Sequence, residues 1–410
     1  IIFTQIIDQG LRCRNDYKAV LKIKELFRNG IPQFIKGTDR ILTYFFNVFG
    51  KFFAWLAIPL IVDKFRTETK SIILAGEKRA LTSHLRKRRK EGVKININHL
   101  GEVVLGKTEA ENRLNEYIRE LENPEVFYIS VKITSIASQL QPLAFDHNKS
   151  LLKERLITLF SVAKKCNKHV NIDMEEYRHV DLTVDAFKES LETEDLLEYT
   201  ASLALQAYIP DSHAIQDDLL EWVKSRVAAG GAPIKIRLVK GANLEMESFD
   251  SELHSWSNPI YTSKLEVDAS FKIMLEKALL PENAPLIHIG VASHNLFDLC
   301  YAYVLAEKND VGEHVTFEML EGMADPVRKS FNDVFKAKKS SIDLLLYAPI
   351  VTKEYFINAM AYLVRRMDEN TYEENFMRHS FGLTVGSEDW DYLKKQFADS
   401  FALKTSISKN

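Results

Sequence analysis

The sequence contains few cysteines and no long apolar run, and both absences narrow the class of protein. Its 410 residues include Cys13, Cys166 and Cys300, which form neither a CxxC pair nor an even set for a disulfide framework. A reduced, cytoplasmic setting is therefore expected. The most apolar stretch, 52–62, contains Pro59 and is shorter than the roughly 20 residues that a membrane-spanning helix needs. We expect it to form a buried or docking helix.

An excess of charge of one sign is also lacking. The net charge is -3, with 27% charged and 46% hydrophobic residues, which is typical of a globular protein. No nucleic-acid partner is expected from this balance. The basic run 86–90 is interpreted as a solvated helix end, and contact with anionic lipid or a partner protein is the alternative. The sequence starts at Ile1, so we treat it as part of a longer chain, and it has no visible signal peptide.

Three regions differ in their pattern of apolar residues. Residues 1–92 are predicted to be helical, with no convincing strand, and residues 378–410 form a tail or linker without a repeat. In residues 93–377, short runs rich in β-branched and aromatic residues alternate with helical segments. The predicted strands cover 94–99, 126–134, 169–173, 201–208, 234–239, 285–291, 314–319 and 342–347.

Eight strands that alternate with helices predict an α/β fold, a (βα)8 barrel of the TIM type preceded by an N-terminal helical region. A doubly wound open sheet is the alternative. It is disfavoured because no G-x-G-x-x-G fingerprint follows any predicted strand. The start of the first barrel helix is predicted from Thr108 and Glu111, which have the spacing of a capping box.

Nearly every predicted strand ends in a polar side chain. In a barrel, the carboxyl ends of the strands form the active site, so these side chains are expected to meet. Each of these residues alone is explained equally well as a helix cap or a surface residue and as a site residue. Packing does not explain why polar residues recur at the same place in successive βα units. They are Glu102, Lys132, Asp173, Gln206, Arg237 with Lys240, His294 with Asn295, Glu318 and Tyr347.

The helix after the eighth strand carries a candidate anion site. Tyr362, Arg365, Arg366 and Glu369 are spaced i, i+3, i+4 and i+7, which places them on one helical face. Two neighbouring guanidinium groups hold a carboxylate or phosphate through charge-assisted hydrogen bonds. A solvated face with an Arg365–Glu369 ion pair is the alternative.

Other reaction templates fit the sequence less well. It has no HExxH motif and no His-x-His on the first strand, so no metal site is predicted. Lys132 at a strand end suits a Schiff base, which makes a lyase of the class I aldolase type the main alternative enzyme. A non-catalytic helical adaptor built on residues 1–90 is a further alternative.

Several motifs together resemble the proline dehydrogenase family, in particular the dehydrogenase portion of the bifunctional proline utilization A proteins. The resemblance extends from about residue 95 to 385, with the motifs in the family's order. RLVKGA (237–242) and YLVRRMDEN (362–370) are the most specific. The others are ISVKITS (129–135), NIDMEEY (171–177), LQAY (205–208), YTSKLEVDASF (261–271), ASHN (292–295), FEMLEGM (317–323) and YAP (347–349).

This resemblance implies an enzyme that binds FAD without a covalent bond. It implies oxidation of L-proline to Δ1-pyrroline-5-carboxylate, the first step of proline catabolism to glutamate, by hydride transfer from proline C5 to flavin N5. The resemblance further implies that the electrons pass to a membrane quinone, which predicts peripheral contact with the inner face of the membrane. A covalently linked aldehyde dehydrogenase domain is implied for the full-length protein, and no NAD-dependent aldehyde oxidation is expected of this segment.

The resemblance also assigns a substrate pocket. Arg365 and Arg366 are implied to bind the carboxylate of proline, and Glu102 to pair with Arg365 as a gate. An amino acid without other polar handles is best fixed by its carboxylate, which agrees with the anion site expected from the helix pattern. The other substrate contacts fall on Lys132, Leu320, Tyr347 and Tyr362.

Asp173 and Arg237 are the implied catalytic residues, because the family places them next to the substrate and the flavin. Arg237 would stabilise negative charge on the reduced flavin. The chain departs from the family at Asn243-Leu244, where an aromatic pair or Tyr-Leu is commoner, and at Glu318, where glutamine is frequent. The implied cofactor contacts are Met174, Gln206, Arg237, Lys240, Gly241, Ala242, Thr262, Ser293, His294 and Asn295.

Overall fold

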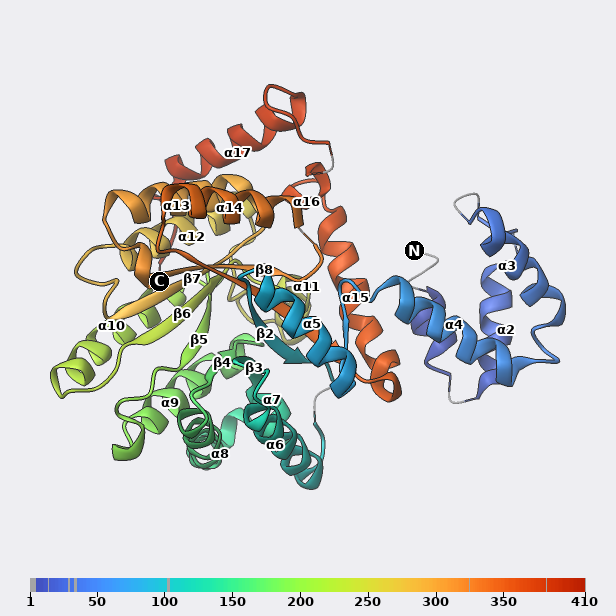
Figure 1. The fold of residues 1–410 in the computed structure, drawn as a ribbon, viewed down its shortest axis with the longest axis horizontal. Helices are drawn as coiled ribbons and strands as arrows, with labels where there is room; N and C mark the ends of the chain where they lie inside the picture. Colours follow the sequence, from blue (N-terminus) through green and yellow to red (C-terminus); the bar gives the residue numbers. More distant parts are fainter. Residues whose placement is uncertain are drawn as a thin grey trace.

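Eight parallel strands close into a barrel, and helices alternate with them around its outside (Figure 1). This arrangement, seen in a computed structural model, confirms the predicted TIM-type barrel with preceding helices, and the open-sheet alternative is wrong. For residues 8, 361, 367 and 368 only the backbone is described. The described ranges are 5–13, 15–28, 30–32, 35–101, 104–323, 325–380 and 382–409.

The barrel closes because the last strand pairs on both sides. In β9, Tyr347 lies opposite Asn96 of β2 and opposite Leu320 of β8, so no edge of the eight-stranded sheet is left unpaired. All pairings are parallel, as βα repeats require. The strands are β2 (Lys94–His99), β3 (Tyr128–Lys132), β4 (His169–Asp173), β5 (Ser202–Gln206), β6 (Ile234–Val239), β7 (Ile287–Ala292), β8 (Val315–Leu320) and β9 (Asp343–Val351).

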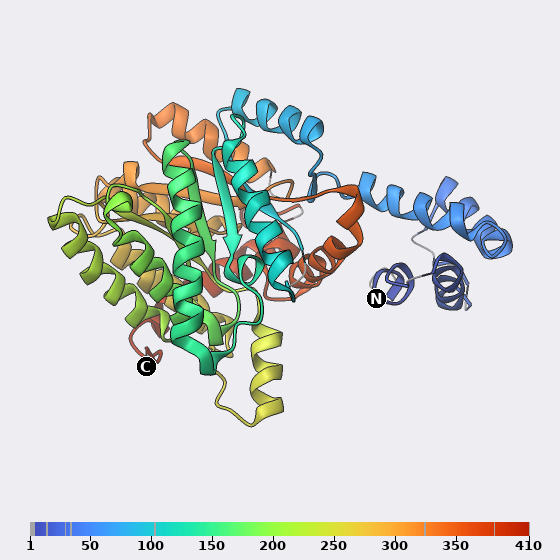
Figure 2. The same cartoon turned by 90° about the horizontal axis from the view of Figure 1, so that it is seen from below.

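Most of the barrel helices lie outside the sheet and bury one face against it, whereas α11 (Leu244–His254) projects away from the barrel (Figure 2) and buries only Glu247 and Ser251. Alternate residues of a strand face opposite sides. In β6, for example, Ile236 and Leu238 belong to the main apolar core, whereas Arg237 reaches across the barrel interior. The helices are α6 (Lys107–Glu122), α7 (Ile133–Ile136), α8 (Phe145–Lys165), α9 (Val180–Leu191), α10 (Ser212–Ala228), α11 (Leu244–His254), α12 (Lys264–Ala278), α13 (Leu296–Lys308), α14 (Asp325–Lys338) and α15 (Phe356–Thr371).

The predicted capping box at the first barrel helix is wrong. Helix α6 begins at Lys107, and its N-cap is Gly106, which has no side-chain hydrogen bond to the helix. Thr108 therefore lies inside the first turn. A capping box is present instead at α12, where the Ser263 and Glu266 side chains bond reciprocally to the backbone.

The N-terminal helices form a lobe beside the barrel (Figures 1 and 2). The lobe comprises the π-helix Ile6–Leu11, α2 (Asp16–Leu26), α3 (Gly37–Phe49) and α4 (Ala54–Glu68), and has a small core of its own. No helix among the described residues is both long enough and apolar enough to cross a membrane. We call the exposed apolar side chains of two of these helices the α3–α4 surface: Ile41, Leu42, Tyr44, Phe45, Val48, Phe49, Trp55, Leu56 and Leu60.

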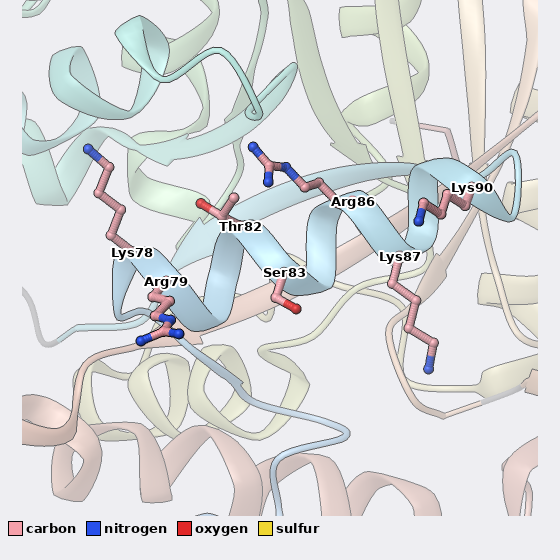
Figure 3. A pocket seen from close by; sticks show the side chains of 7 residues that line it. All are labelled: Lys78, Arg79, Thr82, Ser83, Arg86, Lys87 and Lys90. Carbon is pink, nitrogen blue, oxygen red and sulfur yellow. The ribbon is translucent and has the colours of Figure 1, made fainter.

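A short strand, β1 (Leu74–Ala75), and helix α5 (Lys78–Lys90) connect this lobe to the barrel. The sequence pattern predicts no strand here, yet β1 pairs with the end of β9. Figure 3 shows the basic side chains that fan out from the outer face of α5, where they line an open hollow of about 770 Å³. Arg88, in contrast, is buried and bonds to Glu321 after β8, so the basic run is only partly a solvated helix end.

The tail packs back onto the barrel helices instead of leaving the molecule. It contains α16 (Phe376–His379) and α17 (Glu388–Leu403). The Lys272 ammonium of α12 donates to Ser400 Oγ at 2.7 Å and lies against the rings of Phe397 and Phe401. Helix α17 therefore covers the outer side of α12.

The Arg88–Glu321 pair yields a stability prediction. Arg88→Met leaves His84, at 3.6 Å, as the one cationic partner of the buried Glu321 carboxylate among the described residues, so the free energy of unfolding should fall by about 3–5 kcal/mol. Arg86→Met is the matched control on the same helix, because Arg86 is exposed and its pair with Glu125 is worth less than about 1 kcal/mol. Denaturant unfolding measures both, and equal losses would contradict the assignment.

Candidate active site

The polar strand ends gather at one mouth of the barrel. Lys132, Asp173 and Gln206 are the last residues of β3, β4 and β5, and Lys132 lies directly opposite Asp173 in the parallel register. Because all strands run in the same direction, residues at equivalent positions come together at this end. Of the predicted strand-end residues, Glu102 lies outside the described residues.

Arg237 is the centre of the network inside this mouth. Its Nη1 donates to Asp173 Oδ1 at 2.7 Å and to Ser130 Oγ at 3.1 Å, and its Nε donates to Glu318 Oε2 at 2.5 Å. The guanidinium also lies 5.0 Å from the centre of the Tyr347 ring. Its Nη2 is buried and has no hydrogen-bond partner among the described residues. A buried donor of this kind is costly unless a ligand accepts from it.

Asp173 connects this network to Tyr347 of β9. Besides Arg237, it accepts hydrogen bonds from Asn171 Nδ2 at 2.7 Å and from Tyr347 OH at 2.8 Å. Burial, followed by the charge of Asp173, raises the pKa of Tyr347 well above its usual value. The phenol is therefore neutral at physiological pH and acts as the donor in this pair.

A second group of site residues surrounds Glu175. Lys132 Nζ lies 3.5 Å from Glu175 Oε1, and Gln206 Nε2 donates to the Glu175 carbonyl at 3.1 Å. Gln206 Oε1 is buried and, among the described residues, has no donor. Met174, an implied cofactor contact, lies between Asp173 and Glu175 in the sequence and is partly buried. The group therefore presents one free acceptor and one ammonium.

The loop after β6 is shaped by Gly241. Its φ of 144° is unfavourable for other residues, and a Cβ there would overlap the ring of Tyr208. The preceding Lys240 forms ion pairs with Asp268 and, at 2.7 Å, with Asp298. Ala242 and Thr262, both implied cofactor contacts, are exposed.

Residues 293–295 follow β7. They cap the next helix, and the imidazole among them presents a buried hydrogen-bond donor. The Asn295 side chain caps α13 by accepting from Phe297 N, and Ser293 Oγ accepts from Asn295 N at 3.0 Å. His294 Nε2 accepts from Leu320 N at 3.1 Å, which assigns the imidazole proton to Nδ1. Nδ1 is buried and has no partner among the described residues.

The two arginines of α15 lie in different surroundings. Arg366 is partly buried, packs 5.2 Å from the Tyr362 ring centre, and donates from Nη1 to Glu369 at 2.6 Å. Its Nε is buried and lacks an acceptor within the described part of the chain. Arg365 is exposed and donates to Asn243 Oδ1 at 3.3 Å. The ion pair to Glu369 is thus formed by Arg366, not by Arg365 as in the surface alternative.

Comparisons with known proteins agree with these motifs. A model of the family described as proline dehydrogenase matches residues 81–379. The chain belongs to the proline dehydrogenase family. Members of this family are flavoprotein oxidoreductases that use FAD, so the resemblance found in the sequence is confirmed at the level of the family.

Bifunctional and single enzymes are both among the relatives. The chain is 27% identical to the bifunctional protein PutA of Escherichia coli over 72% of its own length, but spans only 23% of that protein. It is 24% identical to proline dehydrogenase 2 of Bacillus subtilis, covering 70% of this chain and 80% of the relative.

Solved structures agree with this assignment. The structure of proline utilization A from Corynebacterium freiburgense matches with a TM-score of 0.74 and 39% identity, covering 85% of this chain and 34% of that one. Proline utilization A from Bdellovibrio bacteriovorus, inactivated by N-propargylglycine, matches with a TM-score of 0.74 and 25% identity, over 98% of this chain and 44% of that one.

Several site residues were missed in the sequence analysis. Asn171 and Ser130 lie two residues before the predicted Asp173 and Lys132, on the same side of their strands, and this alternation is the signal that identifies them. Asp268 and Asp298, which hold Lys240, lie on helices and have no comparable signal.

The state of His294 leads to a prediction for stability against pH. Burial, with a smaller contribution from the charge of Arg366, lowers the pKa of His294 to about 4. Because the unfolded chain takes up this proton near pH 6.5, the free energy of unfolding should fall as the pH drops from 6.5 to 4.5. His294→Gln keeps an acceptor for Leu320 N and should remove about 2 kcal/mol of this fall.

Urea unfolding at pH 7.0 and at pH 4.5 measures the difference. His147→Gln, on the exposed face of α8, is the control. A native-like pH dependence in His294→Gln would show that the imidazole is not held neutral.

Proposed function

We propose that this chain oxidises L-proline to Δ1-pyrroline-5-carboxylate with bound FAD. The observation that carries this proposal is the buried Nη2 of Arg237, which lacks an acceptor in the part of the chain that the structure describes, at the mouth of a barrel that matches the proline dehydrogenase family. The position of Arg237 between Asp173 and Glu318 supports its role beside the flavin.

The available hydrogen-bonding atoms fit FAD. Arg237 Nη2 and His294 Nδ1 are buried donors, and Gln206 Oε1 is a buried acceptor, all without partners among the described residues. The isoalloxazine ring and the diphosphate offer complementary acceptors and donors. Lys240, Gly241, Ala242, Thr262, Ser293 and Asn295, with Met174, are the further residues that would hold the cofactor. FAD supplies the two-electron acceptor of the reaction.

The substrate carboxylate is assigned to Arg366 and Arg365, with Lys132 as a further cation. Arg366 suits this role because its Nε is a buried donor without an acceptor among the described residues. A guanidinium that is already oriented by Glu369 and Tyr362 loses little entropy when it binds a carboxylate. Arg365 is exposed and therefore suits a gate at the entrance, whose proposed partner is Glu102.

Apolar and aromatic groups exclude water from the reacting ring. Leu320 is fixed by its backbone bond to His294, and Tyr347 by its hydrogen bond to Asp173. The activation barrier for hydride transfer falls when the ring of proline is held in one orientation and water is excluded from it. Arg237 and Asp173 are the proposed catalytic residues; Asp173 accepts a hydrogen bond from Tyr347, and the Arg237 guanidinium lies 5.0 Å from the centre of the Tyr347 ring.

The Schiff-base alternative finds less support. A lysine that forms a Schiff base is usually desolvated in an apolar pocket. Lys132 is partly exposed and lies beside the Glu175 carboxylate. Failure of borohydride to trap a carbonyl compound on Lys132 would remove this alternative.

We further propose that a membrane quinone receives the electrons and that the full-length protein continues into an aldehyde dehydrogenase domain. The relatives named bifunctional support the second point, because the chain matches only part of them. Contact with the membrane is supported by the exposed aromatic side chains of the α3–α4 surface. Residues 1–92, 93–377 and 378–410 are the proposed divisions of the chain.

Spectroscopy of the purified chain tests the activity directly. It should be yellow or become so with FAD, and L-proline should bleach the flavin absorbance under anaerobic conditions. A protein that cannot take up FAD would falsify the proposal.

The arginine assignment predicts a selective change in substrate affinity. Arg366→Met removes a charge-assisted contact worth about 1.5–3 kcal/mol, so the KM for proline should rise by about 10- to 100-fold. Lys353→Met, just before α15, removes an exposed cation paired with Asp63 and serves as control. Unchanged KM in Arg366→Met, with flavin bound, would contradict the assignment.

A further inference from the structure

A second buried cation lies beneath Arg237 in the barrel interior. Lys235 precedes Arg237 by two residues on β6, so both side chains face inward. Lys235 is 6% exposed, and its Nζ lies 2.6 Å from Oε1 of Glu318, which is 2% exposed. The other oxygen of Glu318 accepts from Arg237 Nε. One carboxylate thus joins two cations, and only Arg237 has a place in the proposed reaction.

The intervening strand leaves space for this pair. Gly290 of β7 lies opposite Arg237 in the register, between β6 and β8. A Cβ at Gly290 would collide with Glu318 Oε1 and lie 3.0 Å from Lys235 Cε. The absence of a side chain here therefore allows Lys235 and Glu318 to meet across β7.

The four charges of the interior sum to zero. Arg237 and Lys235 carry two positive charges, and Asp173 and Glu318 carry two negative ones. Burial alone would raise the pKa of Glu318, but Arg237 and Lys235 outweigh it and lower this pKa to about 2. Without Lys235, the two carboxylates would outnumber the single cation.

Stability alone does not account for a buried lysine here. Desolvation of a buried ion pair offsets most of its attraction, and apolar residues of similar volume often serve stability as well or better. The Lys235–Glu318 pair does, however, restrain the orientation of the Arg237 guanidinium. Glu318 and Asp173 hold Nε and Nη1, which leaves Nη2 as the donor for a ligand.

We propose that Lys235 and Glu318 are positioning residues that set the orientation and the electrostatic effect of Arg237 on the bound flavin. Glu318 fixes the guanidinium, and Lys235 cancels the charge that Glu318 brings. This inference rests on the proposed function, since it requires a flavin next to Arg237. Its consequence is that the charge of Lys235 makes the flavin easier to reduce.

Neutralising Lys235 should therefore lower the midpoint potential of the bound flavin. A net negative charge in a poorly hydrated interior disfavours the added electrons of the reduced state. Lys235→Met removes both charge and contact, whereas Lys235→Gln removes the charge and keeps a donor for Glu318. The double variant Lys235→Met with Glu318→Gln restores a zero sum and should return the potential toward the native value.

The test is a redox titration of the FAD-bound chain with a reference dye, together with thermal unfolding of the protein without FAD. Lys94→Met is the matched control, because Lys94 forms an exposed pair with Asp343 at the opposite end of the barrel. It should leave the potential unchanged. If Lys235→Met fails to fold, Lys235→Gln decides the outcome.

A lower potential in the single variants, reversed in the double variant, supports the proposal. A native potential in Lys235→Gln, or a double variant that remains as low as the single one, overturns it. These results differ from a failure of the proposed function, in which the native chain itself would bind no flavin or would not be reduced by proline.

Discussion

The arrangement of charged side chains inside the barrel depends on the guanidinium of Arg237, which is held between two buried carboxylates. Arg237 joins Asp173 of β4 to Glu318 of β8, so that strands on opposite sides of the barrel are connected through charge-assisted hydrogen bonds. Each carboxylate would be costly in this position without the arginine. The same bonds leave Nη2 of the guanidinium without an acceptor among the described residues, so one side chain can serve both stability and ligand binding.

The proposed flavin-side and substrate-side residues come from different elements. Asp173, Arg237 and Tyr347 lie on strands whose registers fix them to one another. Arg365 and Arg366 lie on α15, which is attached to the barrel by apolar contacts at Phe356 and its neighbours. In the proposed function, the residues beside the flavin therefore lie on the sheet, and the arginines that bind the substrate carboxylate lie on a helix.

Much of the fold could be predicted from the sequence because buried parallel strands have a strong local pattern. Strands 94–99, 169–173 and 234–239 agree with β2, β4 and β6 in both bounds. The strand ends led to Asp173 and Arg237 by the general geometry of barrels. The specific roles came from family motifs, since spacing alone left the arginine pair of α15 compatible with any anion.

Two of the misses share a physical cause. A lysine inside a strand, such as Lys235, is ordinarily assigned to a solvent-exposed face, and only closure of the barrel reveals that this face is the interior. Arg88 is similar, because its partner Glu321 is 233 residues away. The start of α6 was misplaced at Thr108 because a glycine can precede a helix without any side-chain cap. Long-range pairing decides the environment of Lys235 and Arg88, whereas the start of α6 depends on the local backbone at Gly106.

The contact between α12 and α17 bears on how such enzymes are divided for study. The family match ends at residue 379, yet Lys272 bonds to Ser400, and Tyr261 OH donates to the carbonyl of Ser408. A fragment cut at the family boundaries would expose the apolar side of α12 and deprive a buried ammonium of its hydroxyl partner. The similarity to the family thus ends at residue 379, whereas side-chain packing onto α12 continues at Phe397, Ser400 and Phe401.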